Sequence, residues 1–328
     1  MSRLSRPLLL PLALVALGGS VAASAVAQDP APTPAPTPVA TPTPTPTPAP
    51  AVDPNPCRRP ELRLRCPDLV MRTPYGFHLL RTKKGRSLLA TTNAIVNVGD
   101  GPLEVRGRRI TRTRMSARQV LRGRTAATTR VQPPNGSIRF FDTRTRGTYW
   151  KFEDAAGFEL WALDAQGFRT RLVRTGPKIF YCYRDLTRVR SLATRRPYRG
   201  SPRTRQYGAC SQKGPISRVT LGTSVGWADI YPWRYPQNWI DVTGFSGCFA
   251  YVHKADPSNR FVELDERNNA SAVSVRLPWR GSGGRRGCPT VRAGAPPRTA
   301  TDPVPTEGDV QPPENPYGGG YSAVGRGT

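Results

Sequence analysis

Histidine is almost missing from this chain of 328 residues, which contains only His78 and His253. A serine or cysteine hydrolase needs a histidine beside its nucleophile, and a metal site built from imidazoles needs several. Two histidines far apart in the sequence offer little to either kind of site. The sequence therefore argues against a hydrolase. We expect His253, which lies in an apolar segment, to be a hydrogen-bonded core residue.

Long apolar runs are missing beyond the N-terminus. Arg3 and Arg6 precede an apolar stretch at 8–18, and the A-V-A at 25–27 fits a signal-peptidase site. The stretch is too short for a membrane anchor, so residues 1–27 are predicted to be a cleaved signal peptide. No later segment has the roughly 18 apolar residues of a transmembrane helix. The sequence thus predicts a secreted protein, extracellular or associated with the cell envelope.

C-x-x-C pairs are absent, although the chain has six cysteines: Cys57, Cys66, Cys182, Cys210, Cys248 and Cys288. This absence excludes the common zinc and thioredoxin motifs. In a secreted protein, three structural disulfides are the expected use of six cysteines. Fifteen pairings are possible, and spacing does not choose among them.

Large side chains are scarce near both ends. Residues 28–56 are almost wholly Pro, Thr, Ala and Val, a composition that favours an extended polyproline II spacer. An idle disordered leader is the alternative. Residues 280–328 are rich in Gly, Arg and Pro and are expected to be mostly disordered. Residues 57–279 remain, enough for one domain with a substantial core.

Lysine is scarce as well, because nearly all of the 49 basic residues are arginines. The formal net charge is +27. Such a surface attracts acidic partners, such as an anionic cell-envelope polymer or an extracellular protein. A drift in composition toward arginine, without a function, is the alternative. No nucleic-acid-binding motif accompanies the charge, so sequence-specific reading of nucleic acid is not expected.

Strand and turn patterns fill the central segment. An apolar run at 87–98 ends in a G-D-G-P turn, and 158–163 and 168–173 flank a turn ending in Gly167, as in a hairpin. Further strands are predicted at 103–106, 240–242, 248–253 and 272–277. Helical periodicity is weak except at Ser116–Leu121. Many short strands predict a mostly β fold, a disulfide-stabilised β-sandwich with long loops.

Five motifs in order across residues 66–278 resemble the lysyl oxidase family. They are P-D-L at 67–69, G-D-G-P-L at 99–103, K-x-x-x-C-x-x-D at 178–185, D-x-Y at 229–231 followed by W-I-D-x-T at 239–243, and E-x-x-x-x-N-N at 263–269. The resemblance implies the family's β-sandwich. It also implies a lysine tyrosylquinone cofactor, formed from Lys178 and Tyr231 with the help of copper held by histidines.

The copper ligands are what this sequence lacks. The family's H-x-H-x-H positions fall on Gly147, Tyr149 and Lys151. Glycine has no side-chain ligand, a protonated tyrosine is a poor one, and a lysine ammonium repels a cation. We therefore expect no copper, no quinone and no oxidase activity. Lys178 and Tyr231 are then more simply packing residues than a reactive pair.

The family's cysteine positions imply the disulfide Cys182–Cys210. Cys57–Cys66, in a short local loop, and Cys248–Cys288, which would tie the basic tail to the domain, complete one possible set. The predicted function is a catalytically inactive extracellular binding or scaffold module. The alternative is an active copper amine oxidase of the protein-lysine type. It would need substitute ligands drawn from Tyr149, Glu153, Asp154 and one histidine.

An aromatic segment surrounds Tyr231, from Trp227 to Tyr235. It is either a structural loop or a surface that stacks on sugars, with Arg234 available for cation–π contact. Asp229 and Asp241 are single carboxylates for which hydrogen-bonded structural roles are expected. The sequence does not indicate an oligomeric state.

Overall fold

The computed structural model describes residues 54–143, 147–177, 179–281 and 286–292. The predicted signal peptide, nearly all of the predicted spacer and most of the predicted tail lie outside these residues. The described chain is mostly β-strand, which confirms the predicted fold class. Helical turns are confined, in this part of the chain, to four short 3₁₀ segments at Pro56–Arg58, Pro60–Leu62, Ala126–Thr128 and Pro236–Asn238. No helix in the described ranges is long and apolar enough to cross a membrane.

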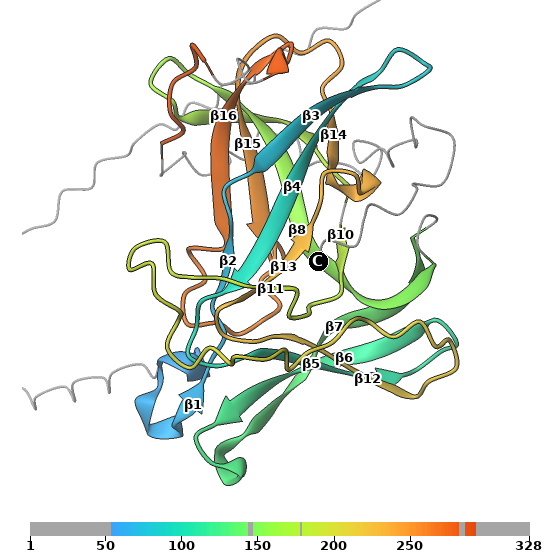
Figure 1. The fold of residues 1–328 in the computed structure, drawn as a ribbon, viewed down its shortest axis with the longest axis vertical. Coiled ribbons are helices and arrows are strands. Elements are labelled where there is room, and N and C mark those ends of the chain that lie inside the picture. Colours follow the sequence, from blue (N-terminus) through green and yellow to red (C-terminus); the bar gives the residue numbers. More distant parts are fainter. Residues whose placement is uncertain (1–53, 144–146, 178, 282–285, 293–328) are drawn as a thin grey trace, which may run out of the picture. The chain divides into compact units, whose positions relative to one another are not determined.

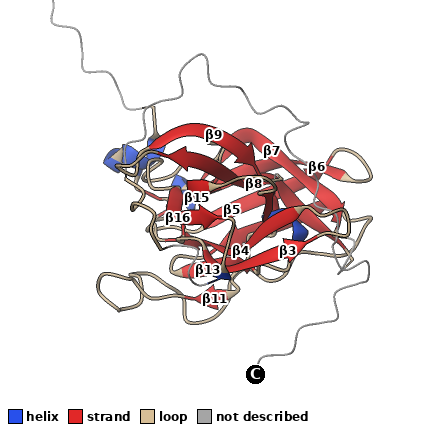
Figure 2. Ribbon diagram, turned by 90° about the horizontal axis from the view of Figure 1, so that it is seen from above, coloured by secondary structure: helices blue, strands red, loops and turns tan. Residues whose placement is uncertain are grey.

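Two antiparallel sheets make up the fold (Figures 1 and 2). The strands of the larger sheet are β1 (Leu64–Arg65), β5 (Leu103–Arg109), β6 (Arg114–Gly123), β7 (Arg130–Asp142), β8 (Thr148–Leu163), β9 (Arg169–Thr175), β10 (Ile179–Tyr181), β12 (Arg218–Thr223), β15 (Gly247–Ala255) and β16 (Ala270–Leu277). Its order is β12-β5-β6-β7-β8-β15-β16, with β1 paired to β6 and with β9 and β10 paired to β8. At one end of the molecule, β5, β6, β7 and β12 form a curled sheet, at the lower end of the view in Figure 1.

The smaller sheet is built around one long strand. Its members are β2 (Leu69–Met71), β3 (Tyr75–Arg81), β4 (Ser87–Asn97), β11 (Thr187–Arg188), β13 (Trp227–Tyr231) and β14 (Trp239–Asp241). Its order is β11-β13-β4-β14, with β2 and β3 also paired to β4.

Strand β4 is buried along its whole length, because both of its faces are covered. Leu89 and Ile95 join the main core between the sheets. The alternate residues Leu88 and Ala90 pack into a second cluster with Trp239 on the other side. A strand covered on both faces has a continuous apolar sequence rather than an alternating one, and the run at 87–98 has that form.

The predicted strands are found, and one predicted helical pattern is wrong. Ser116–Leu121 lies within β6. The pairing of β6 with β7 shifts register at Ala117/Arg118 and again before Val120. Gln119, Val120 and Leu121 are consequently buried in succession. This irregularity breaks the two-residue alternation of a strand and produces spacings that look helical.

Three disulfides join Cys57 to Cys66, Cys182 to Cys210 and Cys248 to Cys288. They match the predicted set. Part of the predicted tail belongs to the folded unit, because Cys288 anchors it to β15 and the amide of Arg292 donates to the carbonyl of Gly167 at 2.9 Å.

Candidate functional site

Tyr231 lies in the wall of a small pocket of about 120 Å³. The lining residues come from the end of β7, from β8, from β13 and the turn after it, and from the segments around the Cys182–Cys210 disulfide: Thr143, Tyr149, Lys151, Cys182, Arg184, Ala209, Cys210, Ile230, Tyr231 and Tyr235. Two of the three positions that the resemblance assigns to copper ligands, Tyr149 and Lys151, are therefore brought beside Tyr231. Gly147 comes just before β8 and does not line the pocket.

Tyrosine rings surround the Lys151 ammonium. Its Nζ lies 4.9 Å from the centroid of the Tyr231 ring and 5.9 Å from those of Tyr149 and Tyr235. These distances fit cation–π contacts, which strengthen when the cation is desolvated, and the Lys151 residue is only 7% exposed. The Tyr231 hydroxyl accepts a hydrogen bond from the amide of Cys182 at 3.0 Å. The pocket is thus a basic and aromatic cavity.

A buried carboxylate lies next to this pocket. Burial raises the pKa of Asp229 to about 7, although the positive charges of Arg184 and Lys151 oppose the rise. Nε of Arg184 is 3.7 Å from the carboxylate. Burial, together with the charge of Asp229, also raises the pKa of Tyr231 well above its ordinary value. Tyr231 is consequently a neutral phenol at physiological pH, which makes it a poor metal ligand.

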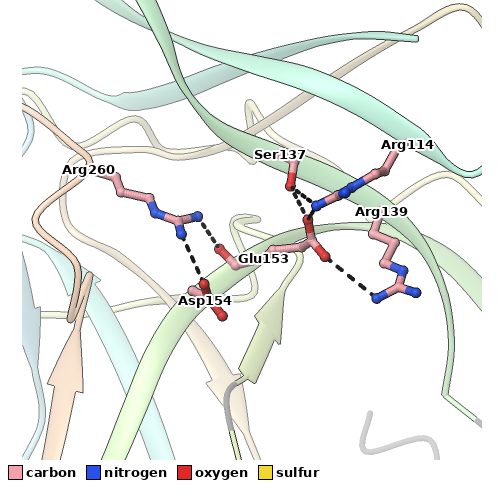
Figure 3. Close-up of polar contacts among 6 residues, drawn as sticks. All are labelled: Arg114, Ser137, Arg139, Glu153, Asp154 and Arg260. Carbon is pink, nitrogen blue, oxygen red and sulfur yellow. Dashed lines mark hydrogen bonds and ion pairs between the residues drawn. The ribbon is translucent and has the colours of Figure 1, made fainter. Parts of the chain in front are cut away.

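The carboxylates that the oxidase alternative needs are held by arginines (Figure 3). Glu153 accepts a hydrogen bond from Ser137, forms an ion pair with Arg114 at 3.0 Å and lies 3.7 Å from Arg139. Asp154 pairs with Arg260 at 2.9 Å. Both carboxylates are engaged away from the pocket, whose lining includes neither of them.

The two histidines do not reach the pocket lining either. His78 is exposed on β3 and stacks on Trp233 with 3.9 Å between ring centroids. His253 is fully buried on β15, where Nε2 hydrogen-bonds to the Thr91 hydroxyl at 2.9 Å. Its Nδ1 has no hydrogen-bond partner among the described residues, so within them the predicted core histidine is only half satisfied. The donor set around Tyr231 therefore does not fit copper.

Lys178 lies outside the described residues, so its expected role, a packing residue rather than the reactive partner of Tyr231, stays a prediction. The aromatic segment around Tyr231 is the strand β13 followed by a turn at 232–235, rather than a loop throughout. Trp227 and Tyr231 are buried, while Trp233 is half-buried under the guanidinium of Arg234, 4.8 Å from its ring. Asp241 has the structural role expected of it, accepting from the amide and hydroxyl of Thr243.

Asp185, the last residue of the motif at 178–185, holds two separate segments together. Its carboxylate accepts from the amides of Gln206, Tyr207 and Ser224 at 2.7, 3.2 and 2.7 Å, and from the Ser224 hydroxyl at 2.8 Å. Asp185 is 2% exposed. The motif aspartate is thus a structural clamp, a role that the sequence motif alone does not indicate.

The first and last motifs meet in space. The buried Glu263 accepts from the amide of Leu69 and from Asn269 Nδ2, the latter at 3.0 Å, and Asn268 donates to Asp68 at 2.8 Å. Burial is the main cause that raises the pKa of Glu263 well above its ordinary value, and the nearby charge of Glu266 adds to it.

Several oxygens in this motif region have no hydrogen-bond partner in the described part of the chain: Asp256 Oδ1, Glu266 Oε2, Asn268 Oδ1 and Asn269 Oδ1. Carboxylate and amide oxygens are ligands for hard cations such as Ca²⁺. No group of three or more His, Cys, Asp and Glu side chains in the described ranges is arranged for a metal. Any cation here would therefore depend on the amide oxygens.

No protein-family model matches the chain, and no curated protein is significantly similar to it.

Proposed function

We propose that this chain is a secreted, lysyl oxidase-like module that does not oxidise amines and instead binds anionic polymers or acidic proteins of the cell envelope. The observation that carries the proposal is a face of the curled sheet on which arginines lie directly opposite one another. The pairs are Arg106 with Arg118, Arg108 with Arg218, and Arg114 with Arg139. We call these six residues the arginine face.

Opposed cations weaken a sheet. Side chains directly opposite on antiparallel strands share one face and lie close together, so like charges there are destabilising. Glu153 offsets the pair Arg114 and Arg139, and Glu104 binds Arg106 at 2.8 Å. Arg108, Arg118 and Arg218 make no ion pair or side-chain hydrogen bond within the described ranges. A polyanion would supply the missing negative charge.

The pocket around Tyr231 supports the part of the proposal that says the protein does not oxidise amines. Tyr149 and Lys151 lie beside Tyr231, as expected if the motif alignment with the family is correct. The same residues present a lysine and tyrosine side chains where an oxidase needs imidazoles. Three disulfides suit an oxidising compartment, which agrees with secretion.

Salt dependence tests the binding proposal. Titration of the mature protein with an anionic polymer should show an affinity that falls linearly on a log–log plot as salt rises, because binding releases counterions. Replacing Arg108, Arg118 and Arg218 with glutamine should flatten that slope. An affinity that is independent of salt for every polyanion tested would reject the electrostatic mechanism.

The amine oxidase alternative is decided by a separate measurement. Metal analysis of natively secreted protein and a redox-cycling quinone stain should both be negative. One copper per chain together with a positive stain would establish the oxidase and reject the inactive module.

A further inference from the structure

Beside the arginine face, three adjoining depressions form one continuous groove. Their volumes are about 500, 480 and 380 Å³. The first and second share Arg65, Asp100, Arg124 and Gly200, and the second and third share Arg122, Gln206 and Tyr207. The groove therefore runs from Arg199 past β1 and the end of β6 to Arg106 on β5.

Among the described residues, five arginines and no lysine line this groove: Arg65, Arg106, Arg122, Arg124 and Arg199. Arg65 and Arg122 lie directly opposite each other on β1 and β6, a fourth pair of opposed cations. Two carboxylates, Asp100 and Glu104, also line it, which leaves three net positive charges.

Both carboxylates are already engaged. Glu104 is 1% exposed and is bound by Arg106, Arg122 and the Tyr207 hydroxyl. Asp100 accepts from the amide of Cys66 at 2.7 Å. In contrast, the side chains of Arg65, Arg124 and Arg199 are exposed and make no ion pair or hydrogen bond in the described part of the chain. Three guanidinium groups are thus left for a ligand.

The groove walls are fixed before any ligand arrives. The Cys57–Cys66 disulfide and hydrogen bonds from Asp100 and Gly101 to the Cys66 carbonyl hold the segment that carries Arg65. A Cβ at Gly101 would lie 2.2 Å from the carbonyl oxygen of Arg65, so only glycine allows this close approach. On the opposite wall, Asp185 holds Gln206 and Tyr207. Such preorganisation lowers the entropy cost of binding.

We infer that this groove, here called the arginine groove, is the docking site for one linear phosphodiester polymer of the cell envelope. The inference rests on the proposed polyanion binding and assigns it a site and a ligand class. Arginine favours phosphate because its planar fork donates two parallel hydrogen bonds to phosphate oxygens, and every basic residue in the described lining of the groove is an arginine. Small wall residues such as Gly123, Thr125 and Gly200 suit a thin chain. The only two aromatic wall residues that are described, Tyr198 and Tyr207, are half-buried and give nucleotide bases little to stack on.

The test compares two variants with equal loss of charge. Arg65→Gln, Arg124→Gln and Arg199→Gln together change the groove. Arg112→Gln, Arg171→Gln and Arg280→Gln together change exposed arginines elsewhere. The probe is a short poly(glycerol phosphate), with poly-glutamate and an oligo-deoxythymidine of similar charge as comparisons, titrated at several salt concentrations.

The groove variant should bind poly(glycerol phosphate) at least about tenfold more weakly than the control variant. Its salt slope should fall by about 2, from roughly 0.7 per lost contact with a flexible chain. Equal affinities for the two variants would overturn the groove while leaving polyanion binding intact. Tighter wild-type binding of poly-glutamate or of oligo-deoxythymidine would overturn the assigned ligand. No binding of any polymer by the wild type would reject the proposed function itself.

Discussion

The buried His253 makes the free energy of unfolding depend on pH. Burial lowers its pKa to about 3, so the folded protein keeps the ring neutral where an unfolded chain, with a pKa near 6.5, takes up a proton. Between these values the unfolded state binds more protons, and stability is therefore lost as pH falls. From pH 6.5 to pH 5 this loss amounts to about 2 kcal/mol.

The variant His253→Gln isolates this contribution, because glutamine does not titrate. Urea unfolding of both proteins at pH 6.5 and pH 5 should show the difference in their free energies of unfolding shifting by about 2 kcal/mol in favour of the variant at the lower pH. The comparison is needed because Asp229, whose pKa is raised, contributes with the opposite sign. A difference that does not change with pH would mean that His253 takes up a proton in the folded protein as readily as in the unfolded chain.

Asp185 is the residue on which two loops depend. Asp185→Ala should lower the free energy of unfolding by roughly 3–4 kcal/mol, because three amide groups and a hydroxyl lose their acceptor in a buried place. Hydrogen exchange should rise first at Gln206, Tyr207 and Ser224. Asp164→Ala, which removes bonds in an exposed hairpin turn, is the matched control and should cost far less. Similar costs for the two variants would contradict the clamp.

On the arginine face, opposed like charges lower the stability of the sheet and attract anionic polymers. Arg108→Glu would face Arg218 across β5 and β12 and replace a repulsive pair by an attractive one. The free energy of unfolding should rise by about 0.5–1 kcal/mol at low salt, while affinity for an anionic polymer falls. Arg112→Glu, in the turn beyond β5, serves as a control that changes the net charge equally. A lower free energy of unfolding for Arg108→Glu would show that repulsion between the opposed arginines does not destabilise the sheet.

The loop between β15 and β16 carries oxygens of Asp256, Glu266, Asn268 and Asn269 that have no hydrogen-bond partner among the described residues. If these oxygens take a hard cation, millimolar Ca²⁺ should raise the melting temperature, and EDTA should reverse the rise. Asn268→Ala should remove the response, and Gln166→Ala, at an exposed amide in the turn between β8 and β9, should keep it. If the melting temperature does not change when Ca²⁺ is added, these oxygens are hydrogen-bonded to water and do not bind the cation.

Local sequence patterns predict a strand or a turn well where the pattern depends on that element alone and not on its neighbours in the fold. The run at 87–98 and the hairpin around Asp164–Gly167 are of this kind. β6 was misread at Ser116–Leu121 because its irregular pairing with β7 depends on a neighbour that the local sequence does not reveal. The arginine groove was not predictable for a related reason. Arg65, Arg122 and Arg199 are far apart in the chain and meet only through strand register and loop packing.

The candidate site, too, could be predicted only in part. The family resemblance assigns Tyr149 and Lys151 to copper positions and Tyr231 to the quinone, and the structure brings these three residues into one pocket. The resemblance could not reveal Arg184, Tyr235 or the buried Asp229 as their neighbours, since those contacts arise from folding. Nor could it reveal that Asp185 and Glu263 act as clamps, because a motif names residues without naming their hydrogen-bond partners.

The molecule combines a large positive charge with three disulfides, and the effects of individual disulfides on stability and on polymer binding can be measured separately. Cys57–Cys66 closes a separation of 9 residues and Cys248–Cys288 one of 40. Loop-closure entropy then predicts a loss of roughly 2.5 kcal/mol for Cys57→Ala with Cys66→Ala, and roughly 4 kcal/mol for Cys248→Ala with Cys288→Ala. Urea unfolding measures this order.

Polymer binding should follow the reverse order. The Cys57–Cys66 pair holds the segment that carries Arg65, whereas Cys248–Cys288 anchors residues that line none of the three groove depressions. The less destabilising double variant should therefore lose more affinity for poly(glycerol phosphate), measured well below both melting temperatures. If affinity instead tracked stability, binding would depend on the integrity of the whole fold rather than on a preformed wall. The Cys57–Cys66 disulfide holds the wall that carries Arg65 against the repulsion among the three exposed guanidinium groups.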